Sequence, residues 1–327
     1  MPSMLTPDAF DTFDENLKLD PDERAEAIKT HNEITDLLRD AGLIVGAFLQ
    51  GSFARKTMIS PLRDIDKVVI LHPSLRTLDP DQVMDRLQRV LAPLYPNARF
   101  TRSRHALQMD FGPDTFSFDI VPAWETDTDD DDVLIANRDT GGWERSNTRQ
   151  LIRVIAERNN RTGGRWVHQV RMGKQVIKHR LDGVIPGLHV ESWAYMVIKE
   201  RLDHDEALAR ILEAGARLVG GTYTDPTGKD QISERLKPEA LAAKGALQEI
   251  ARRAREARRL TDAGDHNEAI RIWHDLCGEP FPEPKAQTTT DALAGAFHGG
   301  SVTSSGTVTS ARTSPQVARP GRSWRRG

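Results

Sequence analysis

Short apolar runs and longer helical stripes alternate along the first part of the chain. Four runs bounded by turn residues predict strands. They cover residues 43–49, 64–71, 98–109 and 116–121. Two stripes predict helices, one that begins at Asp20 and Pro21 and ends near Gly42, and one over residues 81–91. Residues 1–150 are therefore expected to fold as an α+β core.

Helical spacing dominates the chain from Asn147 onward. Its apolar positions predict six helices, over residues 150–157, 167–180, 192–201, 207–219, 238–260 and 267–277. A loop rich in Gly and Thr interrupts this series at residues 220–228. Residues 151–285 therefore predict a helical lobe.

The last segment, residues 286–327, differs in composition from the rest. Ser, Thr, Gly and Arg dominate it, and large apolar residues are few. Because such a segment cannot bury enough apolar surface to offset the entropy lost on ordering, we expect it to be disordered.

Composition narrows the classes of function. The 327 residues are 38% hydrophobic and 28% charged, with a formal net charge of −3. Length and apolar content suit two domains or one large bilobed unit. Near-neutral charge argues against a protein that coats nucleic acid, so strong binding of duplex nucleic acid is not expected. The single cysteine, Cys277, excludes a disulfide within the chain and a Cys-rich zinc site.

No segment indicates a membrane or a secretion route. The apolar runs stay well short of the ~18 residues of a membrane-spanning helix. Met1 to Phe10 lack the basic and apolar regions of a signal peptide. The expected location is cytoplasmic, with no membrane partner.

Three aspartates lie on two of the predicted strands. Asp64 and Asp66 are one residue apart, so they share one face of a strand while Ile65 points to the other. Asp119 lies on a later apolar run. Carboxylates in this pattern can clamp two divalent ions, and the third can help to deprotonate an attacking hydroxyl. An isolated Asp-x-Asp arises by chance in an acidic chain, so it is the ordered set that predicts metal-dependent nucleotidyl transfer.

Gly51 and Ser52 form a small-residue turn ahead of these aspartates. Gly51 lets the backbone approach a ligand closely, and Ser52 offers a hydroxyl and an N-cap for a following helix. Free amides at that helix start would face a triphosphate, and Arg55 would add positive charge. The alternatives are an ordinary turn and an arginine that pairs with an acidic neighbour.

Five segments in this order resemble the bacterial cGAS/DncV-like nucleotidyltransferases (CD-NTases) of CBASS anti-phage defence. They are residues 51–57, 61–66, 118–123, 143–147 and 273–282. The resemblance implies a polymerase-β-like nucleotidyltransferase core with a C-terminal helical lobe and a central cleft. It also implies that nucleoside triphosphates, ATP among them, are joined into a cyclic di- or trinucleotide second messenger with release of pyrophosphate.

The same resemblance implies roles for particular residues. The three aspartates would hold two Mg²⁺ ions, with Mn²⁺ as an alternative. Lys174 and Ser192 would contact the donor phosphates, and Trp193, placed with Ser192 at the start of a helix, would stack on a base. On its own pattern, Lys174 is better explained as a solvated lysine on a basic helix, and Trp193 as a core or hinge aromatic.

Two other functions remain open. A nucleotidyltransferase that modifies RNA ends or a partner protein needs the same carboxylates, although near-neutral charge weighs against RNA. A non-catalytic nucleotide-binding scaffold is the third reading, but it need not retain all three aspartates. In some relatives a conjugating protein joins the C-terminal residue to a target, and the basic tail ending at Gly327 suits such a regulatory partner. A tail that contacts nothing is the alternative.

Overall fold

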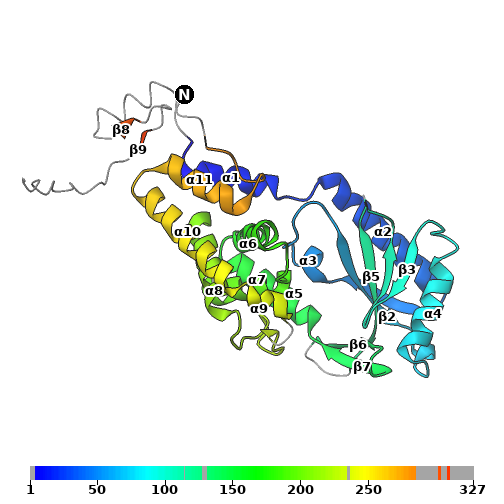
Figure 1. Ribbon diagram of the computed structural model, residues 1–327. Helices are drawn as coiled ribbons and strands as arrows, with labels where there is room; N and C mark the ends of the chain where they lie inside the picture. The colour runs from blue at the N-terminus through cyan, green and yellow to red at the C-terminus, as the bar shows by residue number, and fades with distance from the viewer. Residues whose placement is uncertain are drawn as a thin grey trace, which may run out of the picture. The chain divides into compact units, whose positions relative to one another are not determined.

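A mixed sheet of seven strands forms the first half of the described chain (Figure 1). The strands are β1 (Ile44–Leu49), β2 (Asp64–Leu71), β3 (Arg99–Arg102), β4 (Leu107–Asp110), β5 (Ser117–Glu125), β6 (Val133–Asn137) and β7 (Gly142–Ser146). Their order is β1-β2-β5-β4-β3, with β6 paired to β5 and β7 to β6. β2 and β5 run parallel, and the other pairs are antiparallel. The two strands that carry the aspartates are therefore direct neighbours.

The computed structural model describes residues 4–113, 115–126, 131–233, 236–284, 301–302 and 308–309. Met1–Glu283 form one compact unit and Pro284–Gly327 a second. In the second unit, β8 (Ser301–Val302) and β9 (Val308–Thr309) pair antiparallel. Most of the segment predicted to be disordered, residues 286–327, lies outside the described residues.

Helices α2 (Pro21–Asp40) and α4 (Pro80–Leu91) share one apolar core with the sheet. Successive side chains on a strand point to opposite faces, and Ile65 and Val69 of β2 are fully buried in this core. The aspartates of β2 alternate with these residues and therefore face away from it. The two helices thus cover one face of the sheet, and the aspartates lie on the opposite face.

Lys67 on β2 is an exception in this apolar layer, because it is charged in type and fully buried. Its Nζ donates to the backbone oxygen of His31 at 2.8 Å, lies 3.0 Å from His31 Nδ1 and donates to the hydroxyl of Thr35. Burial lowers the pKa of Lys67 to about 7. These contacts fasten α2 to the strand that carries Asp66.

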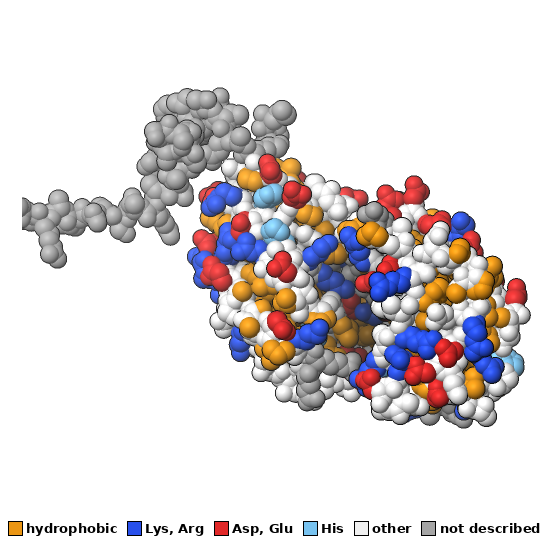
Figure 2. Space-filling view, turned by 45° about the vertical axis from the view of Figure 1, so that its right-hand side comes forward, with side chains coloured by type: hydrophobic (Ala, Val, Ile, Leu, Met, Phe, Trp, Pro, Cys, Tyr) orange, Lys and Arg blue, Asp and Glu red, His pale blue; other side chains and the backbone are white. Residues whose placement is uncertain are grey.

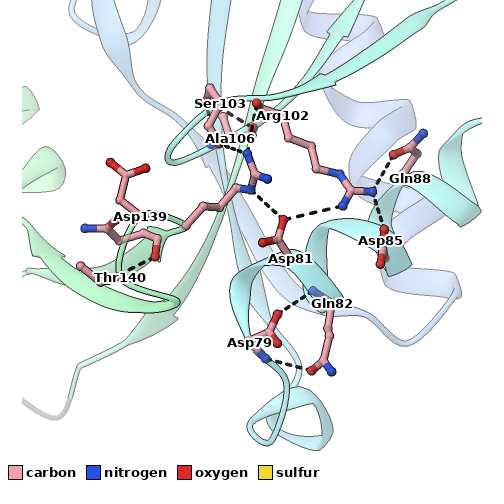
Figure 3. Close-up of polar contacts among 12 residues, drawn as sticks. Asp79, Asp81, Gln82, Asp85, Gln88, Arg102, Ser103, Ala106, Asp139 and Thr140 are labelled. Atoms are coloured by element: carbon pink, nitrogen blue, oxygen red, sulfur yellow. Dashed lines mark hydrogen bonds and ion pairs between the residues drawn. The ribbon is translucent and has the colours of Figure 1, made fainter.

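A polar network holds α4 against the strands beyond β5 (Figure 3). Asp81 on α4 accepts from Arg138 Nε at 2.7 Å and lies 3.7 Å from Arg102 Nη1. Arg102 also pairs with Asp85. Arg138 donates further to the backbone oxygens of Arg102 and Ser103, both at 3.3 Å. The β3–β4 hairpin and the β6–β7 turn are thereby tied to one helix.

The second half is helical, as predicted. Its helices are α5 (Thr148–Arg161), α6 (Trp166–Leu181), α7 (Gly187–Val197), α8 (His204–Leu218), α9 (Pro238–Ala242), α10 (Lys244–Asp262) and α11 (His266–Cys277). Two large apolar clusters fill the space between them. The prediction of an α+β core followed by a helical lobe is therefore confirmed.

The first helix, α1 (Thr6–Asn16), packs on the helical half and lies beside α11 (Figure 1). Phe10 contacts Trp273 and Phe281 with ring centroids 5.2 and 5.1 Å apart. Such edge-on aromatic pairs add to the stabilisation from burial. The start of the chain therefore closes the core of its last helices.

Several predicted elements differ from the observed ones. The single strand expected over residues 98–109 is the β3–β4 hairpin, because the chain turns where the Ser103 amide donates to the oxygen of Ala106 at 2.9 Å. The helix expected to start at Ser192 starts at Gly187, since Pro186 is its N-cap. The helix expected over residues 238–260 is interrupted at Ala243, between α9 and α10. Neither α1 nor the β6–β7 hairpin was expected.

Candidate active site

The three aspartates lie together on the face of the sheet opposite α2 and α4. In the parallel β2–β5 ladder Asp66 pairs with Asp119, and Asp64 with Ser117. Ser117 Oγ donates to Asp64 Oδ1 at 2.9 Å. Gln108 of β4 stands opposite Asp119 in the next, antiparallel ladder, on the same face. The alternation seen in the sequence therefore places all three carboxylates on one surface.

Burial and mutual repulsion perturb these carboxylates. Burial and the charges of Asp119 and Asp64 together raise the pKa of Asp66 to about 6, although the Arg55 guanidinium opposes them. Burial also raises the pKa of Asp119. A hydrogen bond with Gln108 lowers this pKa, and the charge of Asp64 raises it. Asp119 Oδ1 is buried and has no hydrogen-bond partner in the described chain. A positive charge is therefore missing from this cluster.

A divalent cation fits that deficit. Among the described residues, no group of three or more His, Cys, Asp or Glu side chains forms a complete metal cage. Mg²⁺, however, commonly takes one or two carboxylates and completes its shell with water and substrate phosphates. The orphaned oxygen of Asp119 and the raised pKa of Asp66 are what a partial, phosphate-completed oxygen site produces. The aspartates thus match the donor set that a nucleotide-bound Mg²⁺ needs.

The Gly51 turn packs directly against Asp66. Gly51 has a φ of +66°, and a Cβ added to it would lie 1.7 Å from Asp66 Oδ2. The Gln50 amide donates to the backbone oxygen of Asp66 at 2.8 Å. The following helix, α3 (Gly51–Ala54), is one turn long, with Gln50 as its N-cap. The expectation that Ser52 caps this helix is therefore wrong, because Ser52 already lies inside the turn.

A cleft of about 600 Å³ lies between this face and the helical half. Figure 2 shows a hollow in which basic and acidic side chains meet. The sheet half lines the cleft with Gly51, Ser52, Arg55, Asp64, Asp66, Gln108 and Asp119, and the helical half lines it with Lys174, Lys178, Gly187 and Glu191, among others. The structure therefore brings together seven of the nine predicted site residues. Ser192 and Trp193 do not line it.

Arg55 and Lys174 converge on a carboxylate that the sequence analysis missed. Glu191 on α7 is fully buried. Its Oε2 accepts from Arg55 Nε at 2.7 Å, and its Oε1 accepts from Lys174 Nζ at 2.7 Å. Thr57 donates to the same Oε1 at 2.6 Å. Lys174 is therefore a partly buried, ion-paired residue rather than a solvated one.

Ser192 and Trp193 face the interior of the helical half. Ser192 Oγ donates to the backbone oxygen of Leu188 at 3.0 Å, within its own helix. Trp193 is fully buried, and a Cβ on Gly215 would lie 2.7 Å from its ring. A base cannot reach this ring through the close packing, so the stacking role is replaced by a core role. Because α7 begins at Gly187, residue 191 rather than 192 points to the cleft.

Comparison with known proteins finds a domain family whose match spans the three aspartates. Residues 4–159 match the family described as the Second Messenger Oligonucleotide or Dinucleotide Synthetase domain. The search of curated proteins finds no significant match. None of the described helices combines the length and the hydropathy that a bilayer-spanning segment requires.

Solved structures share the fold at low sequence identity. The Bradyrhizobium diazoefficiens CD-NTase CdnG, solved with GTP, has a TM-score of 0.65 at 15% identity, over 82% of this chain and 95% of that one. Escherichia coli MS115-1 CdnC, solved in a CdnC:HORMA-deltaN complex, has a TM-score of 0.65 at 15% identity, over 84% and 97%. Vibrio cholerae DncV in its apo form has a TM-score of 0.59 at 15% identity, over 83% and 78%.

The family match covers the strands that carry the three aspartates, and the structural matches extend through the helical half. Residues 4–159 therefore match the second-messenger synthetase domain family, and the chain has the fold of the solved CD-NTases.

Proposed function

We propose that this enzyme joins nucleoside triphosphates into a cyclic di- or trinucleotide with release of pyrophosphate, and that the product serves anti-phage signalling. One observation carries the proposal: Asp64, Asp66 and Asp119 lie on one face of two paired strands and line the cleft, within the matched synthetase domain. This arrangement supports chemistry at the phosphates of a nucleotide held between the two halves.

Asp119 is the best-placed proton acceptor. Its raised pKa makes it a stronger base than an ordinary aspartate, so it can help to deprotonate an attacking hydroxyl. In the proposed step a ribose hydroxyl gives its proton to Asp119. The ribose oxygen then bonds to the α-phosphorus of a second nucleotide. The bond from this phosphorus to the bridging oxygen breaks, and pyrophosphate leaves with the electron pair.

The remaining residues hold the substrate. Asp64, Asp66 and Asp119 would hold divalent cations, which when bound neutralise the phosphates and polarise the phosphorus under attack. Arg55 and Lys174 lie at the wall of the same cleft and would contact the triphosphate. Gly51 leaves the space that the Asp66 carboxylate occupies. Mg²⁺ is the proposed ion, and Mn²⁺ is the alternative.

The proposal is tested by incubating the protein with all four nucleoside triphosphates and Mg²⁺, treating with phosphatase and analysing the survivors by mass spectrometry. A phosphatase-resistant cyclic product is expected. It should be absent with an Asp64→Ala, Asp66→Ala double variant and present with Asp139→Asn, whose side chain is 67% exposed on the β6–β7 turn. Nucleotide transferred to added RNA or to a protein, without a cyclic product, would instead favour the end-modifying function.

Protein partners belong to the same proposal. CdnC has been solved with a HORMA protein, and a regulatory protein of some kind is proposed here as well. The proposed conjugation at Gly327 concerns residues outside those that the structure describes. Mass analysis of the native protein for an adduct at its C-terminus tests it.

Replacing Gly51 by Ala should cut product formation by about 10²-fold, a loss comparable to that of one preorganised catalytic contact. The new Cβ would meet Asp66 Oδ2 at 1.7 Å, so the carboxylate must move, and a φ of +66° strains the alanine by roughly 1–2 kcal/mol. Initial rates and thermal melting measure the two effects. Gly46→Ala on β1 is the matched control, since its Cβ would meet no atom within 4 Å. Full activity of Gly51→Ala would contradict the close packing.

A further inference from the structure

One fully buried carboxylate joins the two halves of the enzyme at the wall of the cleft. Glu191 belongs to α7, Lys174 to α6, and Arg55 and Thr57 to the segment that follows the Gly51 turn. All three partners bond to Glu191, at 2.6–2.7 Å for their shortest contacts. Arg55 Nη2 adds a second contact to Oε1 at 3.3 Å. Oε1 of Glu191 is therefore contacted from both halves of the molecule, and Oε2 accepts from Arg55 of the sheet half.

The charges of this cluster favour an ionised Glu191. Burial raises the pKa of its carboxyl, but the nearby Arg55 and Lys174 outweigh burial and lower it to about 2. Two cations face one anion, so the cluster keeps an excess positive charge where it lines the cleft. Substrate phosphates would meet cations that are already oriented.

The contacts with Glu191 do not exhaust the donors of the two cations. Lys174 Nζ donates two of its three N–H hydrogens, one to Glu191 and one to Thr57 at 3.1 Å. Arg55 directs Nε and one Nη2 hydrogen at Glu191, out of five donors. Both cations can thus hold the carboxylate and a phosphate oxygen at once.

The missing side chain of Gly187 leaves room for the tip of Lys174. A Cβ on Gly187, the first residue of α7, would lie 2.9 Å from Lys174 Cε and 3.1 Å from its Nζ. The absence of a side chain at Gly187 therefore lets the lysine tip reach Glu191. A glycine at this position is a second, independent constraint on where the charge lies.

We propose that Glu191 is a positioning residue for the triphosphate: it fixes Arg55 and Lys174 across the two halves so that their remaining donors point to the substrate phosphates. The inference rests on the proposed function for the identity of the ligand. A displaced or mobile pair of cations would still attract a nucleotide, but with poorer orientation. The loss should therefore appear mainly in nucleotide affinity and KM, and less in kcat.

The test compares Glu191→Gln, Glu191→Asp and Gly187→Ala with the wild-type protein. Binding of a non-hydrolysable ATP analogue in the presence of Mg²⁺ is measured by calorimetry, and KM and kcat are measured from cyclic product. Glu191→Gln should weaken binding and raise KM about tenfold, with a smaller fall in kcat. Glu191→Asp keeps the charge and should recover part of the affinity. Glu213→Gln, on α8 outside the cleft, is the control.

The outcomes separate the inference from the proposed function. Wild-type protein that binds the analogue but makes no cyclic product would contradict the function alone, and the binding series would still decide the role of Glu191. Unchanged or tighter binding in Glu191→Gln would overturn the inference, because the carboxylate would then merely compete with phosphate. If Glu191→Gln does not fold, as judged by circular dichroism, Gly187→Ala decides: it moves Lys174 without removing a charge, and unchanged affinity would overturn the inference.

Discussion

The Asp66→Asn variant is expected to make cyclic product about 10³-fold more slowly than the wild-type enzyme and yet to melt about 2–5 °C higher. The loss of rate follows because an amide is a poor ligand for a divalent cation and cannot replace the negative charge. The gain in stability follows because a buried, repelled carboxylate is removed. Burial and the charges of Asp119 and Asp64 raise the pKa of Asp66 from 3.8 to about 6.

The pH dependence of that gain has a defined sign. The pKa of Asp66 is higher in the folded state than in the unfolded state, so its contribution to stability is full below pH ~4 and is lost as the pH rises through about 6. The difference in unfolding free energy between the variant and the wild type should thus be near zero at pH ~4 and reach about 3 kcal/mol above pH ~6.5.

Denaturant unfolding without divalent ions, repeated at several pH values, measures this difference. Asp139→Asn on the exposed β6–β7 turn is the control and should change neither rate nor melting temperature. A variant that loses activity with no gain in stability would show that Asp66 is not destabilised in the free enzyme. A variant that keeps its activity would remove Asp66 from the site.

The face that carries the aspartates was predictable because its rule is local. Two aspartates one residue apart share a face of any strand, and apolar neighbours at alternate positions give the opposite face to the core. The position of Asp119 could not be predicted from a local rule. It lies beside Asp66 because two strands pair in parallel, with these residues 53 positions apart in sequence. The family resemblance supplied the role of Asp119, and the parallel pairing is seen only in the structure.

The wall of the cleft was predicted less well, for a physical reason. Glu191 meets Arg55 across 136 positions of sequence, and no periodicity or motif connects a carboxylate on one helix to an arginine in a distant turn. The idea that Arg55 pairs with an acidic neighbour identified the kind of contact but not the residue. A buried ion pair of this type depends on how the sheet half packs against the helical half, which the sequence pattern does not predict.

Ser192 and Trp193 were misplaced by a helix boundary. Pro186 is present in the sequence and favours a helix that starts just after it, but apolar spacing suggested a start at Ser192. A start at Gly187 puts Ser192 in the second turn, so its hydroxyl bonds to its own helix and the indole of Trp193 faces the core. An error of five positions moves the start of a helix by more than one turn and changes which residues lie in its first turn, where the backbone amides are free.

Removal of divalent ions should abolish product formation, by at least about 10³-fold, and added Mg²⁺ or Mn²⁺ should restore it. The described residues offer no complete metal cage, while Asp119 Oδ1 lacks a partner and Asp64 and Asp66 lie beside it. Mg²⁺ should therefore bind more tightly when a non-hydrolysable triphosphate supplies the missing oxygens, which calorimetry with and without that analogue measures directly.

The same competition predicts how the metal requirement depends on pH. Below about pH 6 a proton occupies Asp66, and it must leave before the carboxylate can hold a cation. At subsaturating Mg²⁺ the rate should consequently fall as the pH falls through about 6, and higher Mg²⁺ should move that midpoint to lower pH. A midpoint that does not move with Mg²⁺ would assign the titration to a group that holds no metal. Activity that survives complete chelation would show that the reaction needs no divalent cation. The excess negative charge of the three aspartates would then need another explanation.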